Sequence, residues 1–224
     1  MTKHFQTEML RLKRRLLALA AVVEQSLERA VKAIESRNKA LAEEVIAGDD
    51  EIDRMEVELE EECLKIIALY QPVAIDLRTI IAALKINNNL ERVGDLAQNI
   101  AERAAFIATR PPASVSPDLR TMAHKAQAML RKSIDALVKA NSALAREVLA
   151  DDEEIDAMNR RMYALLQEAM RRYPEEIEVL VQLLSTSRHL ERVADHATNI
   201  AEDVIYLLEG EIVRHRPSLS GVGG

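Results

Sequence analysis

The sequence predicts an all-α protein that consists of two tandem three-helix bundles produced by internal duplication. The composition is the first reason: 48% of the residues are hydrophobic and 30% are charged, but the 224 residues include only 6 glycines, 6 prolines and 3% aromatics. Such a composition is typical of long amphipathic helices. The second reason is a repeat, because the segment 90–102 (LERVGDLAQNIAE) recurs as 190–202 (LERVADHATNIAE). The third is a proline-rich stretch at the midpoint of the chain.

The first half should contain three helices. Apolar residues recur every three or four positions over 6–35, which predicts the first helix. A second helix should follow a short turn and span 39–70, with Gly48 as either a kink or a tolerated glycine. Because proline is accommodated in a first helical turn, Pro72 is compatible with a third helix over 71–109.

The second half should repeat this plan after a linker. The stretch 110–117 (RPPASVSP) has three prolines and two serines in eight residues, which indicates a loop. Three further helices are predicted over 118–139, 142–172 and 174–213. Matching segments lie 103 residues apart in the second helices and 100 apart in the third, so the turn between them is shorter in the second half, where a length change costs little. The predicted organisation is a first bundle, a linker, a second bundle and a disordered tail, at 1–110, 111–117, 118–215 and 216–224.

Charge and cysteine content exclude several classes of function. A net charge of −7 argues against nucleic acid as the main partner, because phosphate binding needs clustered cations. The single cysteine, Cys63, permits no intrachain disulfide and no thiolate metal cage, and its apolar neighbours at helical spacing predict a packing role. No leader and no long apolar run is visible, so we expect a cytoplasmic protein that touches membranes only through partners.

Acidic stripes mark the third helix of each half. Spacing of i, i+4, i+8 and i+11 keeps four side chains on one helical face. They are Glu91, Asp95, Asn99 and Glu102, repeated as Glu191, Asp195, Asn199 and Glu202. The second helices add the pairs Asp49-x-x-x-Asp53 and Asp152-x-x-x-Asp156. Like charges one turn apart repel by a few tenths of a kcal/mol, which a bound cation would remove. Oxygen ligands without thiolates suit Mg, Ca, Mn or iron better than a structural zinc ion.

A solvated acidic surface is the simpler interpretation of these stripes. They lie opposite the apolar face of their own helix, so a metal there would be near the surface. His189 and His196 could add imidazole ligands, but their counterparts are Asn89 and Leu96, so the shared design does not need them. No Glu precedes a histidine by three residues, which disfavours a ferritin-like di-iron site. No Gly-rich phosphate loop and no Ser-His-Asp order is visible either.

Three features together resemble one protein family. They are His4-Phe5, the segment 70–78 (YQPVAIDLR) and the twin Glu-Arg-Val-x-Asp-x-Ala-x-Asn-Ile-Ala-Glu segments. From Thr2 to His215 the chain resembles PhoU, the regulatory protein of the bacterial phosphate-specific transport system. The resemblance implies tandem three-helix bundles, homodimers in many members, and multinuclear iron or zinc clusters on Glu/Asp-x-x-x-Asp motifs. The matching positions are Glu91, Asp95, Glu191 and Asp195, with Asp49, Asp53, Asp152 and Asp156 as the facing pairs.

The resemblance also implies a function without catalysis. It predicts a negative regulator of phosphate uptake and of the phosphate-starvation response, which couples the ATPase subunit of the phosphate ABC transporter to a sensor histidine kinase. The alternative is a metal-dependent enzyme or a metal store built on the acidic stripes. That alternative needs open coordination positions and a dry pocket, which an outward-facing stripe does not provide. The second half has Tyr-Pro-Glu-Glu at 173–176 in place of the Gln-Pro-Val-Ala run, so the function of that run is not duplicated.

Overall fold

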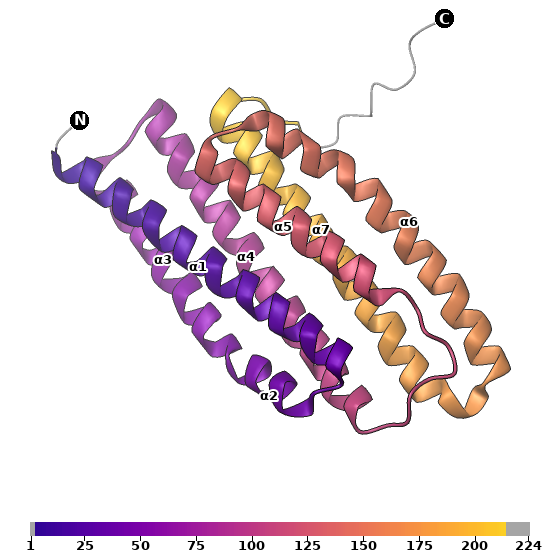
Figure 1. Cartoon of the computed structure of the whole chain (residues 1–224). Coiled ribbons are helices and arrows are strands. Elements are labelled where there is room, and N and C mark those ends of the chain that lie inside the picture. The colour runs from indigo at the N-terminus through magenta and orange to yellow at the C-terminus, as the bar shows by residue number, and fades with distance from the viewer. Residues whose placement is uncertain (1–2, 214–224) are drawn as a thin grey trace, which may run out of the picture.

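The computed structural model describes residues 3–213, and its helices run along one long axis with short connections between them (Figure 1). The elements are α1 (Lys3–Ser36), α2 (Lys39–Ala47), α3 (Asp49–Tyr70), α4 (Ala74–Ala108), α5 (Leu119–Lys139), α6 (Ser142–Arg172), a 3-10 turn (Pro174–Glu176) and α7 (Ile177–Glu209). No strand occurs in this part of the chain, so the predicted all-α class is confirmed. The predicted tail 216–224 lies outside the described residues.

Equivalent caps begin the second helix of each half. The side chain of Asn38 accepts a hydrogen bond from the Leu41 N–H at 3.1 Å, and Asn141 does the same for Leu144 at 3.1 Å. An asparagine at this position satisfies one of the free N–H groups of a helix start. The two caps are 103 residues apart, so the duplication seen in the sequence extends to the local structure.

Gly48 divides the predicted second helix of the first half into α2 and α3. The helix was expected to continue through this position or to kink there, and the structure gives two helices that share Gly48 as their cap. Its counterpart 103 residues later is Asp151, which lies inside the unbroken helix α6. The break is therefore specific to the first half.

The predicted start of the third helix and the predicted end of the last helix were also wrong. The third helix begins at Ala74 rather than at Gln71, because Gln71 ends α3 in the left-handed conformation (φ 45°) and donates its N–H to the Ile67 carbonyl. A residue before proline is also disfavoured in the helical conformation. The last helix was expected to reach residue 213, but it ends at Glu209, where Gly210 adopts a positive φ of 74° and terminates it.

The central helices α4 and α7 join the two halves. Helices α1, α2 and α3 pack on α4, and α5 and α6 pack on α7. Lys85 lies 3.5 Å from Asp203, and Arg103 lies 3.4 Å from Ser185, so α4 and α7 run antiparallel. These two contacts are exchanged by the 100-residue repeat, so an approximate twofold axis relates the halves. The buried apolar side chains of both halves form one continuous core.

Across residues 3–213, no helix combines the length and the hydrophobicity needed to cross a bilayer.

Cys63 is fully buried, and burial together with neighbouring glutamates raises the pKa of its thiol to about 12. The thiol is therefore protonated and packs in the core, as its apolar neighbours predicted.

Candidate metal centre

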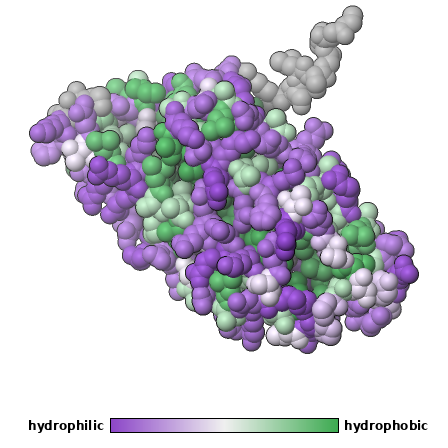
Figure 2. Space-filling view, in the orientation of Figure 1, coloured by the Kyte–Doolittle hydropathy of each residue, from purple (hydrophilic) through white to green (hydrophobic). Residues whose placement is uncertain are grey.

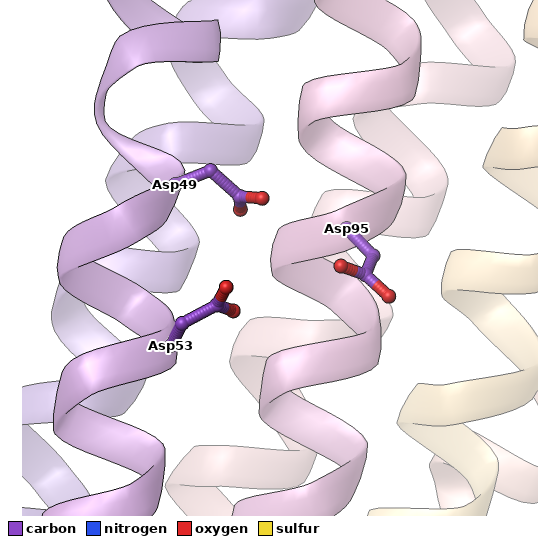
Figure 3. A group of neighbouring side chains, drawn as sticks. All are labelled: Asp49, Asp53 and Asp95. Atoms are coloured by element: carbon purple, nitrogen blue, oxygen red, sulfur yellow. The ribbon is translucent and has the colours of Figure 1, made fainter.

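Helices α3 and α4 bring three aspartates together (Figure 3). Asp49 and Asp53 lie one turn apart on α3 and face Asp95 on α4. One carboxylate oxygen from each side chain lies within 4.8 Å of the others. Among the residues that the structure describes, no second set of three acidic, histidine or cysteine side chains meets this distance. We call Asp49, Asp53 and Asp95 the aspartate triad.

A glycine allows α3 to approach α4 at the triad. A Cβ atom at Gly94 would lie 3.0 Å from Ile52 Cγ2 and 3.6 Å from Asp49 Oδ1. Ile52 is fully buried, so it has little freedom to move away. Its neighbour Asp49 is only 8% exposed, which is unusual for an aspartate. The counterpart of Gly94 in the second half is Ala194, so a Cβ atom is present at this position in the second half.

The electrostatics of the triad favour protonation or a cation. Burial, together with the negative charges of Asp53 and Asp95, raises the pKa of Asp49 to about 6. The pKa of Glu91, one turn before Asp95, is also raised, first by burial and then by the charge of Asp95. Arg92, whose guanidinium lies 3.3 Å from Glu91 and 3.2 Å from Asp95, partly offsets the rise in the pKa of Glu91. A bound cation would lower the cost of holding several carboxylates so close.

Two further glutamates on α3 extend the acidic surface, and the sequence analysis missed them. Glu56 and Glu60 continue the α3 stripe at i+7 and i+11 from Asp49, a helical spacing that keeps them on the same face as Asp49 and Asp53. Asn87, which is 1% exposed, donates hydrogen bonds of 3.0 Å to the carbonyl and to the carboxylate of Glu56. Burial and the charges of Glu60 and Asp53 raise the pKa of Glu56. The helical spacing of the acidic residues on α3 could therefore have identified Glu56 and Glu60 from the sequence.

The second half assembles a looser version of the site. Burial and the charges of Asp195, Asp156 and Glu191 together raise the pKa of Asp152 to about 6. The four predicted residues therefore do lie near one another. Their oxygens do not converge as those of the triad do. The counterparts of Glu56 and Glu60 are the uncharged Asn159 and Tyr163. The second site therefore has fewer carboxylates than the first.

The less certain members of the two stripes lie outside the triad. The amide of Asn99 donates to the Asp95 carbonyl at 2.7 Å, and Glu102 pairs with Arg103. Asn199 lines a groove with Glu56 of the other half, and Glu202 is half-buried. We therefore assign none of these four to the triad site.

The histidines beside the second stripe have polar partners. His196 shares a 2.9 Å hydrogen bond with Asn89, and His189 lies 3.2 Å from Ser185. Burial and neighbouring arginines lower the pKa of both imidazoles to about 4. His196 therefore links α7 to α4, and His189 bonds within α7, so neither of these hydrogen bonds is made to a carboxylate.

The orientation expected for the first stripe was wrong in part. The stripe was expected to face away from the core, but the side chain of Glu91 is only 20% exposed and that of Asp95 is 37% exposed. The helical geometry of α4 alone could not show this, because α3 packs against the flank that carries these residues. The half-buried position favours a ligand site over a fully solvated acidic face.

The donor set of the triad fits a hard cation. Three carboxylates without thiol or imidazole suit Mg, Ca, Mn or iron. Asp49, Asp53 and Asp95 would supply the first ligands, with Glu91 one turn away on α4. A cation there would neutralise repelling carboxylates and hold α3 against α4.

Known proteins resemble this chain over nearly its whole length. The model of the PhoU domain matches residues 16–104 and again residues 119–204. A phosphate-specific transport system accessory protein PhoU homolog from Aquifex aeolicus is 39% identical over 91% of this chain and 92% of its own length. The homolog from Caulobacter vibrioides is 35% identical over 97% and 95%, respectively.

Solved structures give the same result. The crystal structure of PhoU from Pseudomonas aeruginosa matches with a TM-score of 0.90 and 34% identity, covering 92% of this chain and all of that one. The phosphate transport system regulatory protein PhoU from Streptococcus pneumoniae matches with a TM-score of 0.83 and 29% identity, covering 93% and 99%. The two domain matches coincide with the two halves related by the approximate twofold axis.

Proposed function

The chain belongs to the PhoU family, and from this membership we propose that it is a negative regulator of phosphate uptake and of the phosphate-starvation response. The observation that carries the proposal is the match of both halves to the family, at up to 39% identity with accessory proteins of the phosphate-specific transport system. Members of this family are accessory and regulatory proteins rather than enzymes, so the alternative of a metal-dependent enzyme is wrong.

An adaptor role is the mechanism we propose. The chain would contact the ATPase subunit of the phosphate ABC transporter and a sensor histidine kinase when phosphate is plentiful. It would do so from the cytoplasm as a homodimer, with membrane contact only through these partners. A long helical body with several exposed faces is suited to holding two proteins at once, since its rigid helices fix the distance between the faces.

The acidic sites have a structural role in this proposal. Asp49, Asp53, Glu91 and Asp95 in the first half, and Asp152, Asp156, Glu191 and Asp195 in the second, would hold iron, zinc or another divalent or trivalent ion. A bound ion supplies positive charge that offsets the repulsion of the carboxylates. The chain itself supplies the geometry, because Ile52 and Gly94 set the separation of α3 and α4.

Deletion in the native host tests the regulatory role. A strain that lacks this gene should express phosphate-starvation genes in phosphate-rich medium, and the full chain supplied on a plasmid should restore repression. A transcriptional reporter measures both. Normal repression in a deletion strain without a second copy would refute the proposal.

A pull-down tests the adaptor role separately. The tagged full-length chain, recovered from cells grown in high phosphate, should carry the transporter ATPase subunit and the sensor kinase. Light scattering on the purified chain should give the mass of a dimer. If deletion abolishes repression but neither partner is recovered after crosslinking, the chain regulates by another route and the adaptor mechanism fails.

A further inference from the structure

An apolar cavity lies at one end of the molecule, where α1 extends beyond α5. Glu24 pairs with Arg131 at 4.0 Å and Glu35 with Arg120 at 3.1 Å, so α1 and α5 run antiparallel side by side. In this register α5 ends near Leu16. The preceding turns of α1 therefore cover α4 and α7 without α5 beside them. The space left there has a volume of about 510 Å³.

The lining of this cavity has the character of a ligand site. Its walls are mostly apolar side chains from α1, α4, α5 and α7, among them Met9, Leu12, Ile86, Leu137 and Leu207. A few polar side chains, including Lys13 and Asp76, also line it. Pockets of about 300–1,000 Å³ with apolar walls and a few polar groups are typical of small-molecule sites.

The duplicated half does not repeat the part of α1 that covers this space. At the offset of 103 that relates the helix caps, Leu16 corresponds to Leu119, where α5 begins, so the counterpart of the preceding turns of α1 is the linker. Thr79 and Ala83 at the cavity correspond to the larger Val179 and Leu183, which are buried in the second half. The smaller side chains of Thr79 and Ala83 therefore leave space that their larger counterparts would fill.

Exposed apolar side chains surround the same end of the molecule. Leu10 is 59% exposed and Ile75 is 54% exposed, and Val73, at 73%, belongs to the Gln-Pro-Val-Ala run that the second half lacks. Figure 2 shows apolar surface gathered in the upper part of the molecule, toward the N-terminal end of α1. The cavity therefore adjoins apolar surface, which favours entry of an apolar ligand.

We propose that this cavity binds the single acyl chain of an amphiphile, a fatty acid or a lysophospholipid. The chain would lie between α1 and α4, over Thr79 and Ala83. Lys13 is exposed and forms no ion pair with any described residue, so it is available to a carboxylate or phosphate head group. Asp76 lines the cavity too and could pair with the cationic end of a phosphocholine head.

This proposal is independent of the phosphate-regulatory function. It is tested with 11-(dansylamino)undecanoate, whose fluorescence rises in apolar sites, titrated into the full-length protein. Saturable binding at one site per chain is expected. Hexadecanoate and palmitoyl lysophosphatidylcholine, both below their micelle concentrations, should displace the probe, and their relative potency distinguishes a carboxylate from a phosphocholine head.

A variant that carries the second-half side chains at the cavity provides the critical comparison. Thr79→Val with Ala83→Leu should weaken probe binding at least ten-fold, because the new side chains fill the space. Val57→Thr is the matched control: it changes a side chain that is 52% exposed on α3, away from the cavity, and should leave binding unchanged. Circular dichroism confirms that each variant folds.

A surface variant keeps the test decisive if the filled variant does not fold. Lys13→Glu should weaken displacement by hexadecanoate several-fold and leave dodecyltrimethylammonium at least as potent as before. Absence of saturable probe binding by the wild type would overturn the proposal. So would unchanged binding to a folded, filled variant, because the probe would then be bound at another place on the protein.

Discussion

Asp49 shows how a single residue links the fold to a cation. Its carboxylate is buried beside Asp53 and Asp95, and its pKa is raised to about 6, so without a cation its charge destabilises the folded state at neutral pH. When a cation binds the three carboxylates, their short separation stabilises the folded state instead. A solvated acidic surface would not change from destabilising to stabilising when metal is added, so the effect of metal on stability distinguishes a ligand site from a solvated surface.

Replacing Glu91 and Asp95 should reveal which interpretation holds. With saturating metal, Glu91→Gln with Asp95→Asn should lose the stabilisation of the first site, about 3 kcal/mol when metal exceeds its Kd a hundredfold. With chelator, the same change removes repulsion and should raise stability by a few tenths of a kcal/mol. Thermal unfolding with chelator and with added iron, manganese or zinc measures both.

The matched control is the same change in the other half. Glu191→Gln with Asp195→Asn should leave metal at the first site, which elemental analysis of the purified variants can count. If the wild-type melting temperature responds neither to chelator nor to added metal, and no metal is found, the acidic residues are a partner-facing or solvated surface.

His189 and His196 should make stability fall in acid. The pKa of each is lowered to about 4, against about 6.5 in an unfolded chain, so the unfolded state binds more protons between these values. The contribution of the two neutral histidines to the free energy of unfolding is complete above pH 6.5 and is lost as the pH falls toward 4. Replacing them with their counterparts, as His189→Asn with His196→Leu, should reduce this loss.

Chelator-treated samples isolate the histidine effect. Asp49 and Asp152, with pKa values raised to about 6, act in the opposite direction, because their folded state binds more protons over a similar range. The comparison is therefore the difference between variant and wild-type melting temperatures at pH 7 and pH 5. An equal drop in both proteins would contradict the assignment.

At the scale of helices, two glycines have opposite roles. Gly94 lies where α4 meets α3, and a Cβ atom there would come within 3.1 Å of two carbon atoms of Ile52. Gly48 joins α2 to α3 in a helical conformation, and a Cβ atom there would meet only backbone oxygens at 3.4 Å or more. One glycine is required by packing, and the other is not.

Alanine at each position should therefore shift stability in opposite directions. Gly94→Ala should destabilise the protein by about 1 kcal/mol, because overpacking outweighs the gain in helix propensity, and should weaken metal binding at the triad. Gly48→Ala should stabilise by about 0.5–1 kcal/mol. Urea unfolding and metal titration measure these effects. Stabilisation by Gly94→Ala would mean that Ile52 yields freely and that the glycine does not set the helix separation.

For the whole molecule, the two halves should not separate when the linker is cut. The halves share one core along α4 and α7, and Ser114 in the linker is itself bound to Glu176 of the second half at 2.9 Å. We expect limited proteolysis to cleave first within 110–117 or in the C-terminal tail. The fragments should then co-elute in gel filtration, because the interface is large and apolar.

Separation of the fragments without denaturant would contradict this expectation. It would mean that each half is an independent domain. Cleavage near Gly48 with the linker intact would instead count against the predicted boundary and favour one continuous bundle. Mass spectrometry of the first fragments distinguishes these outcomes.

Helix content and duplication could be predicted from the sequence because both are local or periodic properties. Apolar residues every three or four positions give amphipathic helices, and the 100-residue repeat of Leu-Glu-Arg-Val identifies two equivalent halves. The acidic residues were found for the same reason, since helical spacing alone places Glu91 and Asp95 on one face, and Asp49 and Asp53 on another. Family membership followed from these motifs.

Only the tertiary structure decided how these faces meet. Helical geometry placed Glu91 opposite the apolar side of α4, but packing of α3 on that flank buried most of it, and this contact is not encoded in the spacing of α4. The two acidic sites differ because Gly94 of the first half is replaced by Ala194 in the second, and because the residues on the facing helix differ as well. The cavity beside Ala83 likewise arises where α1 extends past α5. Distances between helices depend on side chains far apart in the sequence, whose volumes combine only after folding.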